Sequence, residues 1–366
     1  MKKVFFILSL WLTVISCQSS KKETSIKIEQ SVTPLEKVTT DQAFFNAEGR
    51  EVTPETYPTD ETSRQMLKVQ TAVGVNEFLH KRELTPTDEQ PVVRMNRDTY
   101  YSTAVVDVSE GASVTIPEVP EGKYVSVQSV TEDHRIQAMK YGPGTFDLAT
   151  HVGTHLYLVI RLDATLTEEE VKEIQDQMSI QANADKKFEA SPVNEESFTK
   201  VEEELKAKQP GIVKRDGPRA LEGMFTDPND ASNELFTEEK YQVGAAIGWG
   251  GAQMKDNIYE VSGNYATDSC YQLTFEDPGN EAFWSITVYD KNGFMFSDLA
   301  NYSSNTAQAN EDGTYTISFG CGDDAPNNLA IENPTNYFNI AIRHYKPSSK
   351  VMEEDYRLLP MMKSIK

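Results

Sequence analysis

Apolar and polar residues alternate along two stretches of the chain, and a period of two is typical of a strand with one buried face. The first stretch predicts strands over residues 100–108, 123–130 and 155–162. In the last of these, aliphatic side chains share one face and polar or aromatic side chains share the other: Leu156, Leu158, Ile160 and Leu162 against His155, Tyr157 and Arg161. Glycine and proline clusters between the segments predict turns.

The second stretch begins at Tyr241 and shows the same alternation. It predicts strands over residues 270–275, 283–289, 315–319 and 338–345, with turn signals between them. In the last segment, apolar side chains again lie opposite polar or aromatic ones: Phe338, Ile340 and Ile342 against Asn339, Arg343 and Tyr345. Trp284 alternates in phase with aliphatic neighbours, which favours core packing over a ligand groove.

Helical spacing replaces the alternation over residues 62–80 and 166–209. Thr167 and Glu170 have the spacing of a capping box, which marks the start of a helix. The pattern as a whole predicts a mainly β fold, with antiparallel sandwich-like modules at residues 61–165 and 241–366 and a helical insertion and connector at 166–240.

The start of the chain has the features of an export signal. Two lysines precede a twelve-residue apolar run that is short for a membrane span. The run ends in VISC at residues 14–17, which resembles a bacterial lipobox and implies lipidation of Cys17. An ordinary secretory signal and an N-terminal membrane helix are the alternatives. We expect a lipoprotein signal peptide over 1–17, a flexible tether over 18–60 and a cell-envelope location on the outer membrane, facing the periplasm or the surface.

The charge of the chain argues against nucleic-acid partners. The formal net charge is −22, and removal of Lys2 and Lys3 with the signal leaves 33 basic and 57 acidic groups, or 33 − 57 = −24. Such a chain repels phosphate backbones and anionic headgroups. The lipid anchor is therefore the expected membrane contact, and the acidity is otherwise explained by solubility.

Cys270 and Cys321 are the cysteines that remain after signal removal. An oxidising envelope allows them to form a disulfide, and two separate buried thiols are the alternative. His151 and His155 have the spacing of a helical metal pair, but Gly153 and the strand pattern argue against a helix there. We expect no metal and no cofactor.

Two segments resemble a known pairing of bacterial families. Residues 93–102 read VRMNRDTYYS and resemble the signature of domain-of-unknown-function family 1254. Residues 283–290 read FWSITVYD, and with GWGG at 248–251 and RHYKP at 343–347 they resemble family 1214. The resemblance implies β-sandwich or jelly-roll modules. Members have been suggested as hydrolases, but the families are named for lacking an assigned function.

The densest polar cluster lies at the entry to the first strand. Arg94, Asn96, Arg97 and Tyr101 are candidate ligand-binding residues, because arginine forks bind carboxylate or phosphate, and Asp98 is a candidate base. The structural alternative is that the arginines and Asp98 pair with each other.

Two further groups of candidates lie away from that cluster. His134, beside Asp133, is a candidate catalytic partner of Asp98, although a surface histidine is the simpler interpretation. Arg343 and Tyr345 share the polar face of the last strand and are candidates to meet the first module across a domain interface.

Two functions remain open. The first is an envelope lipoprotein that binds a small molecule, glycan or lipid in a pocket between its modules, as a monomer or homo-oligomer. The second is an envelope hydrolase that cleaves an ester or glycosidic bond with a water activated by Asp98. The sequence contains no G-x-S-x-G elbow and no complete catalytic triad.

Overall fold

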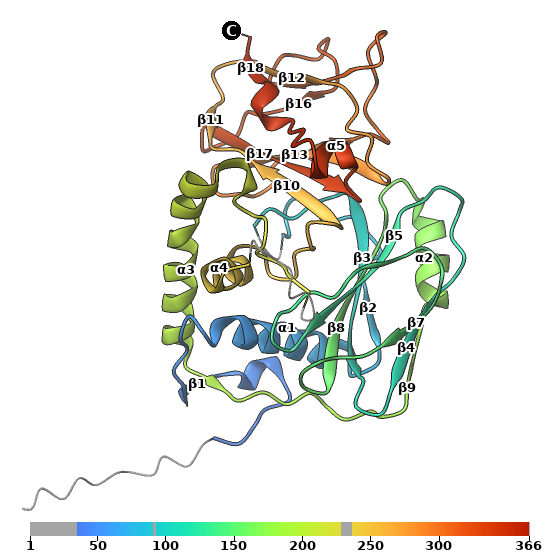
Figure 1. Cartoon of the computed structure of the whole chain (residues 1–366), viewed down its shortest axis with the longest axis vertical. Coiled ribbons are helices and arrows are strands. Elements are labelled where there is room, and N and C mark those ends of the chain that lie inside the picture. Colours follow the sequence, from blue (N-terminus) through green and yellow to red (C-terminus); the bar gives the residue numbers. More distant parts are fainter. Residues whose placement is uncertain (1–34, 91–92, 228–235, 366) are drawn as a thin grey trace, which may run out of the picture. The chain divides into compact units, whose positions relative to one another are not determined.

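A computed structural model describes residues 35–90, 93–227 and 236–365. Figure 1 shows a mainly β body in which the strands are gathered into separate sheets and helices cover one side. The signal peptide, with Cys17, and residues 18–34 of the predicted tether lie outside the described residues. Within the described ranges, no helix is both long enough and apolar enough to cross a bilayer.

The N-terminal module is built on two sheets. The larger has the order β2 (Phe78–His80), β3 (Thr99–Asp107), β8 (His155–Asp163), β5 (Val125–Thr131), β6 (Lys140–Tyr141). The smaller has the order β7 (Gly144–Leu148), β4 (Ala112–Ile116), β9 (Ser179–Ala182). The aliphatic face of β8 packs with the smaller sheet and with helix α2 (Glu168–Gln177) in one buried cluster. The predicted alternation and capping box are both confirmed.

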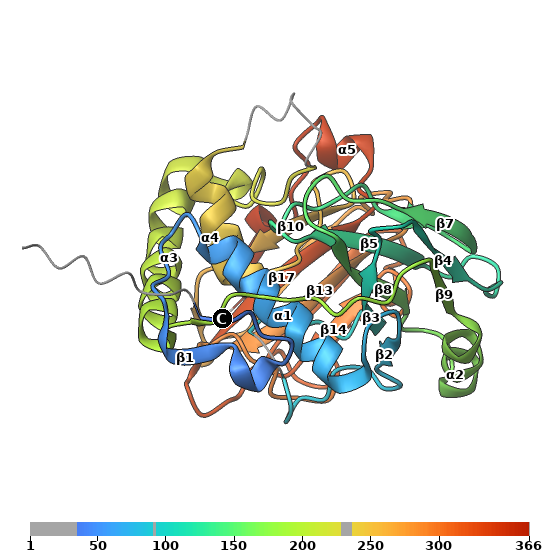
Figure 2. The ribbon, with the colours of Figure 1, turned by 90° about the horizontal axis from the view of Figure 1, so that it is seen from below.

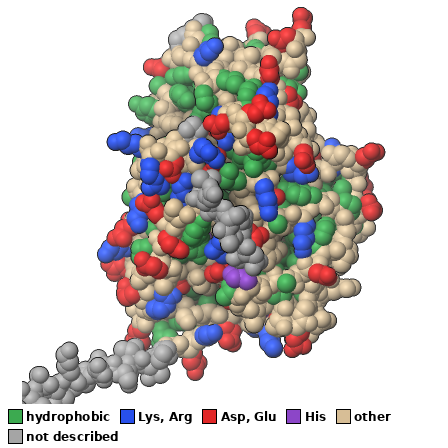
Figure 3. Space-filling model, viewed as in Figure 1, with side chains coloured by type: hydrophobic (Ala, Val, Ile, Leu, Met, Phe, Trp, Pro, Cys, Tyr) green, Lys and Arg blue, Asp and Glu red, His purple; other side chains and the backbone are tan. Residues whose placement is uncertain are grey.

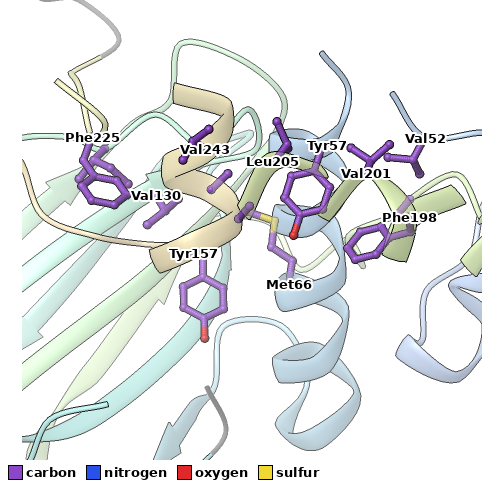
Figure 4. Packing of buried hydrophobic residues seen from close by; sticks show 14 of the residues in the cluster. Val52, Tyr57, Met66, Val130, Tyr157, Phe198, Val201, Leu205, Phe225 and Val243 are labelled. Atoms are coloured by element: carbon purple, nitrogen blue, oxygen red, sulfur yellow. The ribbon is translucent and has the colours of Figure 1, made fainter. Parts of the chain in front are cut away.

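Helices cover one end of the opposite face of the larger sheet, where Tyr157 and Val159 lie. They are α1 (Tyr57–Val73), α3 (Glu195–Asp216) and α4 (Glu238–Gly248). Figure 4 shows Tyr57 and Met66 of α1 packed with Phe198 and Leu205 of α3, with Tyr157 of the sheet close by. The helices at 166–240 are therefore part of the core of the N-terminal module rather than an insertion between two finished modules.

The tether prediction is wrong for residues 41–60. This segment forms a short 3-10 helix η1 (Asp41–Ala43), strand β1 (Phe45–Arg50) and the first turn of α1. Phe44 is completely buried in the same cluster as α1 and α3, and β1 makes bridges to Val193 at both of its ends. Apolar burial against a distant part of the chain overrides the polar local composition.

The C-terminal module is a sandwich. One sheet has the order β10 (Asn257–Val261), β17 (Tyr337–Tyr345), β13 (Phe283–Asp290), β14 (Asn301–Ser303), with β11 (Tyr265–Ala266) also on β17. The other has the order β16 (Asn328–Leu329), β15 (Tyr315–Phe319), β12 (Tyr271–Phe275), β18 (Met362–Ser364). Trp284 is fully buried between them. The remaining elements are α5 (Ser349–Met352), η2 (Gly217–Arg219) and η3 (Leu359–Met361).

Cys270 and Cys321 form a disulfide, with their Cα atoms 4.8 Å apart. They lie directly before β12 and shortly after β15, where Tyr271 and Phe319 face each other in the ladder. The bond therefore closes the end of this strand pair.

Candidate functional site

The polar faces of the two main sheets are packed toward each other. Figures 1 and 2 show β10, β13 and β17 beside the sheet that contains β3, β8 and β5. Strand register aligns one row of side chains across each sheet: Tyr101, Arg161 and Ser126 on the N-terminal sheet, and Tyr259, Arg343 and Ser285 on the C-terminal sheet. The candidate site comprises these rows and the groups between them.

Asp98 joins the two modules. Its carboxylate accepts hydrogen bonds from Ser285 Oγ at 2.6 Å, Tyr345 OH at 2.9 Å and Asn301 Nδ2 at 2.8 Å. These donors come from three strands of the C-terminal sheet, and the Asp98 side chain is fully buried. Asp98 is thus a crosslink between modules, and three of the roughly four lone pairs of its carboxylate are already engaged.

Arg97 does not pair with Asp98, so that part of the structural alternative is wrong. Its Nη1 donates to the carbonyl oxygen of Thr85 at 2.7 Å, because adjacent residues at a strand entry point to opposite sides. Asn96 does contact residues of the site. Its Nδ2 donates to Tyr101 OH at 2.8 Å, and its Oδ1 accepts from the Asp98 backbone N–H.

Arg343 is also engaged within the protein. It donates to Thr287 Oγ1 at 3.1 Å, to Tyr289 OH at 2.9 Å and to the Arg94 carbonyl oxygen at 2.8 Å, and its Nη1 lies 3.9 Å from Asp98 Oδ2. Burial opposes its charge, but Tyr289 and Asp98 outweigh that effect and raise the pKa of Arg343. Arg343 is therefore a charged partner of Asp98, and both of its terminal nitrogens are engaged within the protein.

Arg94 reaches the site through its backbone, which binds Arg343. Its φ of 55° lies in the left-handed region. The guanidinium is partly buried and its Nε has no partner among the described residues. Burial lowers the pKa of Arg94, and Arg343 adds to the effect by repulsion.

Arg161, like Arg94 and Arg97, has no ion pair with a carboxylate among the described residues, but it is buried whereas they are half-buried. Its charge also acts on the buried Asp256, without a direct ion pair. In the described part of the chain its one hydrogen bond runs from Nη1 to Gln128 Oε1 at 2.6 Å, and its guanidinium lies 5.6 Å from the Tyr101 ring centre. Its exposed fraction is 9%, so the side chain is not completely sealed. Sequence reasoning placed Arg161 on the polar face of its strand but did not select it, because nothing in the alternation showed what covers that face.

Tyrosines surround Arg161. Tyr101, Tyr124, Tyr259 and Tyr345 all lie close enough to act on its charge, and together they offset the effect of burial and raise the pKa of Arg161. Tyr124 packs edge-on against Tyr345, with ring centres 5.6 Å apart. Burial raises the pKa of Tyr124 to about 12 and raises the pKa of Tyr345 well above its usual value, so both hydroxyls are protonated donors at neutral pH.

A second buried carboxyl, Asp256, lies at the edge of the cluster. Its Oδ1 accepts from Tyr141 OH at 2.8 Å, and burial raises the pKa of Asp256. A small cavity of about 10 Å³, with room for one water, is lined by Tyr259, Asn257 and Phe225 among others on the connector side.

His134 is not a partner of Asp98. It is fully buried, its Nε2 accepts from the Gly250 backbone N–H at 3.0 Å, and it stacks on Trp249. Burial lowers its pKa to about 3, so it is neutral. None of the described contacts of His134 are shared with Asp98, so the predicted catalytic pair is not assembled.

The GWGG turn gives His134 an indirect link to Arg161. Gly250 donates to His134 through its N–H and accepts from Gln128 Nε2 at 2.8 Å through its carbonyl oxygen, and Gln128 holds Arg161. Gly250 has a φ of 71°, and a Cβ on Gly251 would lie 2.3 Å from the Phe225 ring. Both glycines are therefore required by geometry.

His151 and His155 do not form a metal pair. His151 Nε2 lies 3.0 Å from Asp133 Oδ2, and His155 Nε2 lies 2.8 Å from the Lys186 carbonyl oxygen. Among the residues of known placement, no group of three or more His, Cys, Asp or Glu side chains is arranged to hold a metal ion.

Comparison with protein families matches the chain in two places. Residues 75–147 match the family described as "Protein of unknown function (DUF1254)", and residues 256–349 match "Protein of unknown function (DUF1214)". Both domains of the predicted pairing are present. Asp98 lies in the DUF1254 segment and Tyr345 in the DUF1214 segment, so their hydrogen bond joins the two domains. Arg161 lies just beyond the DUF1254 match.

A solved structure shares the fold at low sequence identity. The VPA0106 protein from Vibrio parahaemolyticus is 17% identical, with a TM-score of 0.62 over 86% of this chain and 98% of its own. An uncharacterised protein from Burkholderia cenocepacia is 13% identical, with a TM-score of 0.49 over 80% of this chain and 84% of its own. Comparison with functionally curated proteins gives no match.

Proposed function

We propose that this protein is an exported, lipid-anchored envelope protein that binds a small-molecule ligand between its two modules, at Arg161. The observation that carries the proposal is a buried guanidinium that pairs with no described carboxylate and leaves donors unused. Buried charges in proteins are normally paired. A bound ligand would supply the missing acceptor at a junction of two domains, which is a favoured place for ligand sites.

The engagement of Asp98 favours binding over hydrolysis. A general base must be able to reach a water and take its proton. Three donors already bind the Asp98 carboxylate, and His134 binds Gly250 and shares no described contact with Asp98. The predicted activation of a water by Asp98 is therefore without support. No specific observation favours a second function.

The binding proposal is tested with a small-molecule library and melting temperature as the measurement. Compounds that raise Tm for the wild type are repeated on Arg161→Gln and on Arg82→Gln, which removes an exposed salt bridge to Asp176. We expect hits that disappear in Arg161→Gln and persist in Arg82→Gln. A library without hits, or hits that are unaffected by Arg161→Gln, contradicts the proposal.

The proposed location in the cell envelope is supported by the resemblance of residues 14–17 to a lipobox ending at Cys17. It is consistent with the Cys270–Cys321 disulfide, since disulfides persist in oxidising compartments. We expect Cys17→Ala to prevent lipidation and to move the protein from the membrane fraction to the soluble fraction. Metabolic labelling with palmitate and cell fractionation measure both effects. Continued labelling or unchanged membrane association would count against the anchor.

A further inference from the structure

We infer that the ligand is an organic monocarboxylate, held side-on by Nε and Nη2 of Arg161. This inference rests on the proposed function and specifies its ligand class. Nη1 is occupied by Gln128, and no described acceptor binds Nε or Nη2. The Nε atoms of Arg94 and Arg357 also lack a partner, but they are completely buried, whereas Nε and Nη2 of Arg161 are not among the completely buried atoms without a partner. The unused edge of the guanidinium is a planar pair of parallel donors.

The same chain shows what this edge binds. Arg64 uses Nε and Nη2 to hold both oxygens of Glu61 at 2.6 and 2.7 Å. Arg215 holds both oxygens of Asp216 through the same two atoms, at 2.8 and 3.2 Å. The fork spacing matches the two coplanar oxygens of a carboxylate. Arg161 presents this fork without its carboxylate.

No described carboxylate of the protein binds the Nε and Nη2 edge of Arg161. Asp98 is held by Ser285, Tyr345 and Asn301. Asp256 is held by Tyr141, and the charge of Arg161 acts on it without a hydrogen bond or ion pair to the fork. In a chain of net charge −22, most arginines find a carboxylate, as Arg50, Arg64, Arg82, Arg215, Arg219, Arg343 and Arg357 do. Burying an arginine without an ion pair costs free energy, and an external anion at Arg161 would offset that cost.

The surroundings favour one negative charge and an organic body. The tyrosines around Arg161 supply hydroxyls and ring faces, and Arg343 is already balanced by Asp98. A phosphate dianion would bring a second charge into a site with no second free cation among the described contacts, near the carboxyl of Asp256. A carboxylate has its one charge matched by Arg161, and the tyrosine rings can pack against its carbon skeleton.

The test is isothermal titration calorimetry on the purified full chain with matched probes. The probes are benzoate and propionate, their neutral isosteres benzamide and propionamide, and inorganic phosphate. We expect the carboxylates to bind at least about 10-fold more tightly than the amides and more tightly than phosphate, since hydrogen bonds to charged groups are the stronger ones.

Two variants locate the binding. Arg161→Lys keeps the charge but loses the fork, and is expected to weaken carboxylate binding by about 10- to 100-fold. Gln128→Glu places an internal carboxylate against Arg161, at the loss of the hydrogen bond from Nε2 to Gly250, and should weaken binding similarly. The Tm and the cooperativity of unfolding of both variants are measured beside their affinities, so that lost binding is not confused with lost folding. Arg82→Gln is the control and should bind as the wild type does.

The outcomes separate the ligand class from the proposed function. Equal binding of amides and carboxylates, tighter binding of phosphate, or unchanged affinity in both Arg161→Lys and Gln128→Glu overturns the monocarboxylate. If library compounds still bind at Arg161 in those cases, the proposed function stands. If neither the carboxylates nor any library compound binds, both fail.

Discussion

Asp98 and Arg161 are both buried, but only Asp98 is satisfied within the protein. Asp98 accepts three hydrogen bonds and faces Arg343, whereas Arg161 has one hydrogen bond and no described carboxylate. Both are charged residues on the polar side of a strand or at its entry, yet their roles differ. Asp98 links the two modules, whereas Arg161 has donors available to bind a ligand.

Removing the charge of Asp98 should destabilise the fold. Asp98→Asn leaves Arg343 buried without a carboxylate and turns an acceptor into a donor facing Ser285 or Asn301. We expect a loss of about 3 kcal/mol in the free energy of unfolding, measured by urea denaturation.

Asp176→Asn is the matched control, because its salt bridge to Arg82 is exposed. That variant should lose less than about 1 kcal/mol. A similarly small loss for Asp98→Asn would show that Asp98 is not the crosslink described above.

The burial of His134 makes stability depend on pH. Its pKa is lowered from 6.5 to about 3 in the folded protein, with Asp133 and Arg135 as its charged neighbours. Below pH 6.5 the imidazole becomes protonated in the unfolded chain but stays neutral in the folded protein. The contribution of His134 to the free energy of unfolding is therefore complete above pH 6.5 and declines by up to about 1.4 kcal/mol per pH unit as the pH falls toward 3.

His134→Asn tests this dependence, since asparagine tolerates the φ of 60° found there. Urea denaturation at pH 7, 6 and 5 should show that the variant loses less stability on acidification than the wild type. Parallel curves for the two proteins would contradict the burial of a neutral histidine.

At the scale of elements, β1 explains why residues 41–60 are not a tether. Gly49 lies against the backbone of Val193, and a Cβ at Gly49 would be 2.4 Å from the Val193 carbonyl carbon. Gly49→Ala should therefore cost about 3 kcal/mol of stability by overpacking.

Gly263→Ala is the matched control, because nothing lies within 4 Å of its added Cβ. Chemical denaturation should show no loss for this variant. If Gly49→Ala is equally harmless, β1 does not dock on the body.

Periodicity predicted β8, β13 and β17 with the correct faces, because alternation records which side of a strand is buried. The site residues Asp98, Tyr101, Arg343 and Tyr345 were also identified and are brought together by the interface. Periodicity could not show that two polar faces cover each other, so Arg161 was passed over. Nor could it show that residues 41–60 dock, since that contact joins positions about 150 residues apart.

At the scale of the whole molecule, acidic side chains are spread over the face that Figure 3 draws. Figure 3 shows acidic and basic side chains interspersed on one face, without a single large patch of either sign. This distribution suits solubility better than electrostatic recognition of a macromolecule. Specific recognition is then left to the interior, where the two modules bring Arg161 and its tyrosines together.

The most direct test of the central claim is a high-resolution crystal structure of the protein grown with benzoate. The account predicts both carboxylate oxygens within about 2.7–2.9 Å of Arg161 Nε and Nη2, with Gln128 still on Nη1. The contradicting result is an Arg161 whose fork is filled by Asp98 or Asp256, with no benzoate between the modules.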